Sequence, residues 1–481
     1  MFKNYLNKIT SSSIKVFIFL FVISLFARLL TLFPLVIDHD ESTYLVIANE
    51  WLKGFIPFKD YIDIKPIGIY GIYALATAVF GQSIIAIRLL TILAISTSAY
   101  FLFKAGREAG KSNFISLSSG LLYLSLISVD QWGWSGNTEI FFNLFTTAAL
   151  YFLVKQKKIA THYFLIGFLM GLGFIIKYHV AFDFLAFLLL IGWTNKKSFK
   201  DFSSRILITG VSFIIPFGLV NLFYYLSGNY TEFIDVSFII PSRYSSAING
   251  MESGLFVVQF YLFFLPLSIL YFMGIYKRLK LSLDKTKDAI LPIVWPVFVW
   301  VAVLITGKLF PHYYGQALIP FSFFALDYLE NLDFKKRSTS IFKKAIISVL
   351  GILFIVGIVS QFFSLILKPD NEKAVLEYLI EHIETEDKFY SQKMVLHYML
   401  DKPPQTKYIH PTIFSNDEHI EAFRINLEDE YDSIRNSNSK YIYCYTNGGP
   451  MLREMIQDDY ELVLKSPDKY NLWLKKGEIT K

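Results

Sequence analysis

Long apolar runs are the feature that most restricts how this chain of 481 residues can fold. A helix needs about 20 mostly apolar residues to cross the hydrocarbon core of a bilayer, which is about 30 Å thick. Runs of about this length, several of them shorter, recur up to residue 367, and they read as 16–37, 84–103, 113–130, 138–154, 159–176, 178–193, 205–226, 254–276, 289–306, 311–328 and 345–367. The sequence therefore predicts a polytopic α-helical membrane protein with about eleven transmembrane helices.

Composition agrees with this class, because 54% of the residues are apolar and 17% are aromatic. The formal net charge of +6 resembles a nucleic-acid signal, but most basic residues fall in short turns between apolar runs. We therefore expect a membrane and no nucleic acid as partner. A single cysteine, Cys444, excludes an intramolecular disulfide and a cysteine metal cage, and we interpret it as a buried thiol in a strand.

One apolar run, 67–80, is too short to cross the bilayer and predicts an interfacial helix in the first outer loop. With 67–80 in the interface, 23 basic residues fall in turns on one side of the membrane. The opposite loops hold only six, namely Lys53, Lys59, Lys65, Lys177, Arg243 and Lys308. Because basic loops stay in the cytoplasm, we expect a cytoplasmic N-terminus and an extracytoplasmic C-terminus.

The composition changes at Lys368 from apolar to charged and mixed. Helix-like stretches at 371–384 and 418–436 alternate with strand-like ones at 388–390, 440–445, 460–464 and 470–474. The sequence thus predicts a transmembrane domain over 1–367 and a small extracytoplasmic α/β domain over 368–481. About 110 residues are enough for such a domain to bury its own core.

Three carboxylates crowd into four residues after the first span, at Asp38-His39-Asp40-Glu41, with Tyr44 close behind. Mutual repulsion and partial desolvation raise the pKa of at least one carboxyl group in such a cluster, which suits a general base. An acidic helix N-terminus is the alternative, because it complements the helix dipole. A metal ion bound by His39 and the carboxylates is a weaker alternative, so we expect no required cofactor and no metal ligands.

Further polar residues lie at the outer ends of later apolar runs, namely Glu139, Lys177, Tyr178, His179, Lys308, His312, Tyr313 and Tyr314. Each one alone fits a lysine at a helix end or a hydrogen-bonded histidine. Their shared side favours a site, and an anionic ligand would explain the costly charge of Lys177 between two apolar runs. Lysines facing a phosphate and a carboxylate facing a hydroxyl are the groups that an enzyme needs to displace a phosphate-linked leaving group.

These motifs together resemble the C-type superfamily of membrane glycosyltransferases, which take a sugar from a polyprenyl-phosphate carrier. The resemblance covers about residues 15–330 and is greatest to the branch of the aminoarabinose-lipid A transferases and protein O-mannosyltransferases. The residues that carry it, in order, are Asp40-Glu41 with Tyr44, Lys65-Pro66-Ile67 with Tyr70, Phe80-Gly81 before Arg88, Glu139, Gly173 with Lys177, Lys308 with Pro311-His312-Tyr313, and Pro320.

The resemblance implies roles for these residues and for their neighbours. Asp40 corresponds to the catalytic carboxylate, with Glu41 and Glu139 as further catalytic candidates. Glu139 replaces the aspartate usual in the aminoarabinose branch. The donor phosphate would be bound by Lys65, Lys177, Lys308, His312 and Tyr313, with Asp38, Tyr44 and His179 as other site residues. Residues after 367 receive no function from the resemblance.

The predicted function is that of an inverting glycosyltransferase on the extracytoplasmic face of the membrane, by expectation a bacterial inner membrane. It would move a hexose or pentose from a polyprenyl-phosphate-linked donor to a lipid, glycan or protein acceptor. A lipid-linked sugar transporter or flippase is the alternative, which the gathering of charges at one face rather than at the midplane disfavours. A third possibility is a membrane anchor for the outer α/β domain.

Overall fold

The computed structural model of the chain describes residues 8–129, 133–156, 158–195, 198–244, 248–281, 290–330, 341–413, 416–445, 450–466 and 468–478. The basic turns predicted at 196–197, 282–289 and 331–340, together with Lys3 and Lys157, lie outside these residues. The chain forms two compact units. The first comprises Met1–Leu32, Arg88–Phe223 and Ser245–Phe363, and the second comprises Phe33–Ile87, Tyr224–Tyr244 and Ser364–Lys481.

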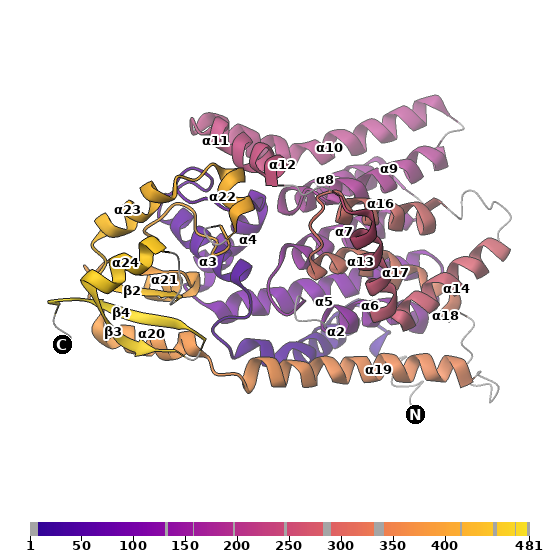
Figure 1. Cartoon of the computed structure of the whole chain (residues 1–481). Helices are drawn as coiled ribbons and strands as arrows, with labels where there is room; N and C mark the ends of the chain where they lie inside the picture. Colours follow the sequence, from indigo (N-terminus) through magenta and orange to yellow (C-terminus); the bar gives the residue numbers. More distant parts are fainter. Residues whose placement is uncertain are drawn as a thin grey trace. The chain divides into compact units, whose positions relative to one another are not determined.

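The described part of the first unit is helical (Figure 1). Its elements are α2 (Ser13–Arg28), the 3-10 turn η1 (Leu29–Leu32), α5 (Ile84–Glu108), α6 (Asn113–Ile127), α7 (Thr138–Val154), α8 (Ala160–Ile176), α9 (Val180–Asn195), α10 (Phe199–Leu226), α13 (Gly250–Phe263), α14 (Leu265–Leu281), the π-helical turn η4 (Ile290–Val294), α16 (Trp295–Leu304), the 3-10 turn η5 (Pro311–Tyr313), α17 (Tyr314–Phe324), α18 (Leu326–Leu329), α19 (Ile341–Gln361) and the π-helical turn η6 (Phe362–Ile366).

Apolar helices confirm the membrane-embedded, mostly helical class. Among the described residues, four helices are long and apolar enough to cross a membrane alone, at Ser13–Leu32, Ile84–Glu108, Phe199–Leu226 and Ser348–Ile366. Shorter apolar helices of 10–17 residues include α4 (Ile67–Phe80), α6, α7, α8 and α9. The number of eleven spans therefore stays a prediction, as does the interfacial position of α4.

The run 254–276 is broken in the structure instead of forming one straight helix. Helices α13 and α14 are bent by 92° relative to each other at a break that contains Phe264. Pro266 explains the break, because proline has no N–H to donate and its ring collides with the carbonyl group four residues earlier. The apolar count of the run could not show this bend.

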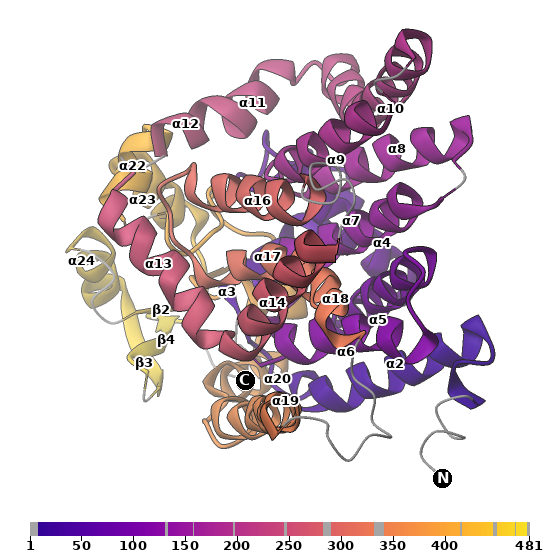
Figure 2. The same ribbon diagram turned by 90° about the vertical axis from the view of Figure 1, so that its right-hand side faces the viewer.

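Helices α8 and α10 lie side by side in the first unit (Figure 2). An added Cβ at Gly167 or Gly171 of α8 would overlap the carbonyl oxygen of Thr209 or Phe213 in α10. Small residues spaced four apart allow two helix backbones to approach closely in a membrane. These two glycines therefore set the separation of the helices.

The second unit contains helices and one sheet. Its elements are α3 (His39–Leu52), α4 (Ile67–Phe80), α11 (Tyr230–Ile234), the π-helical turn η3 (Asp235–Ile239), α12 (Ile240–Tyr244), α20 (Asn371–His382), β1 (Phe389–Ser391), α21 (Met394–Leu400), α22 (Asp417–Phe423), α23 (Leu427–Ser437), β2 (Tyr441–Tyr445), α24 (Pro450–Asp459), β3 (Tyr460–Lys465) and β4 (Tyr470–Lys475). All four strands predicted from the sequence are present.

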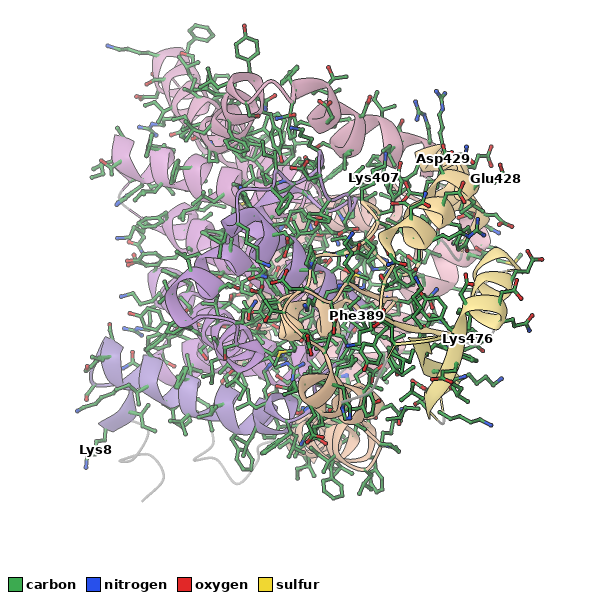
Figure 3. All side chains as sticks on the ribbon, turned by 90° about the vertical axis from the view of Figure 1, so that its left-hand side faces the viewer. Lys8, Phe389, Lys407, Glu428, Asp429 and Lys476 are labelled. Atoms are coloured by element: carbon green, nitrogen blue, oxygen red, sulfur yellow. The ribbon has the colours of Figure 1, made fainter. Side chains whose placement is uncertain are left out.

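The sheet has the order β1-β2-β4-β3, with β1 parallel to β2 and the other pairs antiparallel. Its core includes Tyr390, Ile442, Cys444 and Tyr460. Cys444 is a free, buried thiol in β2, as predicted, and burial raises its pKa to about 12. In the same unit, the side chains of Glu428 and Asp429 are exposed and project outward from α23 (Figure 3).

The loop after the first span is bonded to the C-terminal segment within the second unit. Asp401, at the end of α21, forms an ion pair of 2.6 Å with Lys53 and accepts hydrogen bonds from Asn49 and Gln82. The backbone N–H of Ile62 donates to the carbonyl oxygen of Lys407 at 2.7 Å. The outer segment predicted over 368–481 thus shares a compact unit with 33–87, and its independence as a domain stays a prediction.

Candidate active site

The acidic cluster lies at the start of α3, where Asp38 is the N-cap residue. Its backbone is extended, and its side chain accepts a hydrogen bond of 3.0 Å from the backbone N–H of Asp40. This bond satisfies one of the N–H groups that the first helical turn leaves without a partner. Asp40 and Glu41 follow in the first turn, where their charges complement the helix dipole.

Asp40 is held by two basic side chains. One carboxylate oxygen, Oδ2, lies 2.9 Å from Nζ of Lys65, and the other, Oδ1, lies 2.9 Å from Nε2 of His410. Only 13% of the Asp40 side chain is exposed, against 23% for Lys65. The two neighbouring donors and partial burial hold the carboxylate in place, and a small part of it stays exposed to solvent.

Lys65 owes its position to the residue that follows it. Pro66 is the N-cap of α4 and has an extended backbone, so the chain leaves Lys65 directly before the helix begins. A residue before proline is itself restricted to extended conformations. The sequence named Asp40 and Lys65 as separate site residues, and the structure joins them in an ion pair.

His410 is a contact of Asp40 that sequence reasoning missed. It lies 370 positions further along the chain, beyond the first outer loop and all the later spans. It is one of eight histidines, and no motif or periodicity distinguishes it from the others. Only the chain's tertiary folding brings it to the cluster.

His39 borders the same cluster without serving as a charged partner at neutral pH. Burial is the largest cause that lowers the pKa of His39 to about 4, and the positive charges of Lys393 and His410 add to it. The imidazole is therefore neutral over the physiological range. The neutral ring of His39 therefore adds no positive charge beside Asp40.

Tyr44 lies one turn after Asp40 and is fully buried in α3. Its ring packs edge to face with the rings of Tyr70 and Tyr73 in α4, at centroid distances of 5.9 and 5.4 Å. The Tyr70 hydroxyl donates to Oδ2 of buried Asp63 at 2.9 Å. These aromatic contacts pack α3 against α4 beneath the acidic cluster, which gives Tyr44 a supporting position.

A second group of predicted residues lies in the first unit. Lys177 follows the last residue of α8, and its Nζ donates to Oε1 of Glu139 in the first turn of α7. Oε2 of Glu139 accepts a hydrogen bond of 2.9 Å from Thr138. The Lys177 ammonium also lies 3.7 Å from the centre of the Tyr313 ring, which is a cation–π contact.

The histidines of this group pack around Tyr313. The ring centroids of His312 and His179 lie 4.7 and 5.3 Å from that of Tyr313, both nearly perpendicular to it. His312 and Glu139 also line one small cavity of about 20 Å³. Lys308 lies in the turn before η5, where its backbone N–H donates to Thr306 at 3.4 Å.

The structure thus gathers the predicted residues into two groups, one in each compact unit. Asp38, Asp40, Glu41, Tyr44 and Lys65 lie in the second unit. Glu139, Lys177, His179, Lys308, His312 and Tyr313 lie in the first. Among the described residues, no cluster of three or more His, Cys, Asp or Glu side chains has an arrangement that could hold a metal ion.

Comparison with known proteins gives matches of sequence over part of the chain. Residues 64–222 match the dolichyl-phosphate-mannose-protein mannosyltransferase family. Undecaprenyl phosphate-alpha-4-amino-4-deoxy-L-arabinose arabinosyl transferase 1 of Proteus mirabilis is 26% identical over 169 residues, which are 34% of this chain and 30% of that protein. The corresponding transferase 2 of Proteus mirabilis is 23% identical over 217 residues, 42% of this chain and 38% of that protein. The matched region is therefore less than two fifths of these relatives' length.

Comparison of structures gives a match over nearly the whole chain. The crystal structure of ArnT from Cupriavidus metallidurans bound to undecaprenyl phosphate has a TM-score of 0.67 at 11% identity, and the match covers 96% of this chain and 99% of that one. At this identity the likeness establishes the fold. Together the comparisons confirm the resemblance to the polyprenyl-phosphate-dependent C-type superfamily that the sequence indicated.

Proposed function

We propose that this chain, with the fold of a polyprenyl-phosphate-dependent membrane glycosyltransferase, transfers a sugar from a polyprenyl-phosphate donor to an acceptor outside the cytoplasm. The observation that carries the proposal is the Asp40 carboxylate, held between Lys65 and His410 at the start of α3. The relatives support it, because the two named above are transferases that use an undecaprenyl-phosphate-linked aminoarabinose. The sugar of this chain is a hexose or pentose, and its acceptor is a lipid, a glycan or a protein.

In the proposed reaction, Asp40 accepts the proton of an acceptor hydroxyl as its oxygen attacks the anomeric carbon of the donor. The new bond joins that carbon to the acceptor oxygen. The bond between the anomeric carbon and the phosphate oxygen breaks, and the polyprenyl phosphate leaves with the electron pair. Attack opposite to the leaving group inverts the anomeric configuration. The Lys65 ammonium, which lies 2.9 Å from Asp40, carries a positive charge that can stabilise the departing phosphate.

The second group, in the first compact unit, has a part predicted by the resemblance. The resemblance assigns Lys177, Lys308, His312 and Tyr313 to the donor phosphate, and Glu139 to a catalytic role. In the structure, Glu139 already neutralises Lys177. We therefore propose that an incoming phosphate competes with Glu139 for the Lys177 ammonium.

A flippase is not favoured as an alternative, because the relatives named above are transferases. A flippase would move the donor lipid across the membrane and leave the sugar on its carrier. An anchor for an outer domain would tolerate any change at Asp40 that keeps the fold.

The test replaces Asp40 in cells that naturally produce this chain and analyses their surface glycans and lipids by mass spectrometry. Asp40→Asn keeps the size of the side chain and removes the base, so we expect the sugar-modified product to disappear while the protein stays inserted in the membrane. Asp60→Asn is the matched control, because Asp60 lies in the same outer loop and its carboxylate accepts a hydrogen bond of 2.7 Å from the backbone N–H of Ile56. Cells with the Asp60→Asn control should make as much product as wild-type cells.

The mass difference between the two profiles also names the sugar and the acceptor. Full product in the Asp40→Asn cells contradicts the proposed base. Movement of the donor lipid across the membrane of liposomes that contain the purified chain, without covalent transfer of the sugar, would favour the flippase.

A further inference from the structure

The hydrogen bonds of His410 define which ring nitrogen carries its proton. Nδ1 lies 3.3 Å from the backbone nitrogen of Thr412, which donates to it, and 2.8 Å from the Thr412 hydroxyl oxygen. A nitrogen that accepts from an N–H group carries no proton of its own. The proton of the neutral ring is therefore on Nε2, the atom that lies 2.9 Å from Oδ1 of Asp40.

We infer that His410 is a positioning residue for the base Asp40, supplied to the site by the C-terminal segment. Its Nε2–H donates to Oδ1, while the Lys65 ammonium donates to Oδ2, so the carboxylate cannot rotate. A carboxylate has about four lone-pair sites, so the carboxylate held by these two donors can also act as the base for the acceptor's proton. This inference rests on the proposed function, because it assigns His410 a task only if Asp40 is the base.

Burial of His410 supports this role. Only 14% of its side chain is exposed, and Asp40 is buried to a similar degree. The segment that carries it is joined to the first outer loop nearby, where the backbone N–H of Ile62 donates to the carbonyl oxygen of Lys407. The residues after 367, to which the resemblance assigns no function, thereby contribute a residue that contacts the proposed catalytic carboxylate.

Charges around His410 predict how the role depends on pH. The charged or titratable groups that face it are Asp40, Asp63, Lys65 and His39. Burial alone would lower the pKa of His410, but the hydrogen bond and negative charge of Asp40, with Asp63, raise it above its usual value. As the pH falls through this raised pKa, the ring becomes an imidazolium and weakens Asp40 as a base. The transfer rate should therefore fall on the acid side because of His410.

The experiment compares His410→Gln, whose amide can still donate to Asp40 but does not titrate, with His410→Ala, which can do neither. His382→Gln is the matched control, since the described His382 side chain bonds to the carbonyl oxygen of Tyr378, one turn earlier in its own helix α20. Purified variants are added to membranes of the Asp40→Asn cells, which supply the native donor and acceptor. The initial rate of product formation is measured by mass spectrometry from pH 5 to 8.5.

We expect His410→Ala to lose about tenfold or more in rate, as misplaced catalytic groups do. His410→Gln should recover most of this rate at neutral pH, and its acid limb should move to lower pH. His382→Gln should match the wild type at every pH. A wild-type rate and pH profile in His410→Ala, with Asp40→Asn inactive, overturns the role of His410 and leaves the proposed function intact. An active Asp40→Asn protein overturns the proposed function itself.

A second measurement does not depend on transfer. The purified chain, labelled with ¹³C at the histidine ring, is titrated by NMR, and His410→Gln identifies the signal. The pKa of His410 should fall when Asp40 becomes asparagine, because the raising charge is removed. A pKa unchanged by Asp40→Asn overturns the inferred contact.

Discussion

At the scale of single residues, Glu139 and Lys177 form a buried ion pair in which each side chain neutralises the charge of the other. Only 3% of the Glu139 side chain and 11% of the Lys177 side chain are exposed. The sequence suggested an anionic ligand as the reason for a buried lysine, and the structure shows that Glu139 already supplies a negative charge. Because both groups have left water, each depends on the other.

Glu139→Gln should destabilise the protein strongly, because it leaves the Lys177 ammonium buried without a compensating charge. Removal of one partner of a buried ion pair costs about 3–5 kcal/mol. The thermal unfolding midpoint of the purified protein in detergent measures the effect. Adding Lys177→Met should restore part of the lost stability, as in a double-mutant cycle. Losses that simply add would show that the two charges do not depend on each other.

At the scale of elements, the sequence predicted α4 and all four strands, and the beginning of α3 as an alternative, because these signals are local. Asp38 caps a helix through its own short side chain, and Pro66 directs the start of the next. The bend at Phe264 was missed because the mean hydropathy of an apolar run hardly changes with a single proline such as Pro266. Contacts between helices, such as that of α8 with α10, depend on residues far apart in the chain.

Gly171→Ala should lower stability by forcing α8 away from α10. A Cβ at this position would overlap the carbonyl oxygen of Phe213, whereas a Cβ at Gly210 of α10 meets no atom within 4 Å. Alanine gains about 1 kcal/mol of helix propensity over glycine at either site, so the difference between the two variants reports packing alone. The thermal unfolding midpoint should drop for Gly171→Ala and stay level or rise for Gly210→Ala. Equal midpoints would contradict the close approach.

At the scale of the whole molecule, the predicted orientation in the membrane rests on the distribution of basic residues. It places the exposed Glu428 of α23 outside the cytoplasm and the exposed Lys280 of α14 inside. The buried Cys444 thiol, with its raised pKa, should stay unreactive because the thiolate is the nucleophile. The native chain should therefore not react with a thiol label.

A membrane-impermeant maleimide tests this orientation. In intact spheroplasts, Glu428→Cys should react and Lys280→Cys should not, while both should react once the membrane is opened with detergent. The wild-type chain, with only Cys444, is the control for background labelling. Labelling of Lys280→Cys in sealed spheroplasts would overturn the predicted orientation.

The sequence by itself determined the membrane-embedded helical class and the strands of the C-terminal segment, and it named Asp40 and Lys65 as candidate site residues. Apolar length, alternation and capping are local properties, so neighbouring residues are enough to define them. The tertiary structure alone decided that Glu139 neutralises Lys177 and that His410 reaches Asp40 across 370 positions. Such contacts depend on how distant segments pack, and the residues next to a histidine or glutamate in the sequence do not identify its partner.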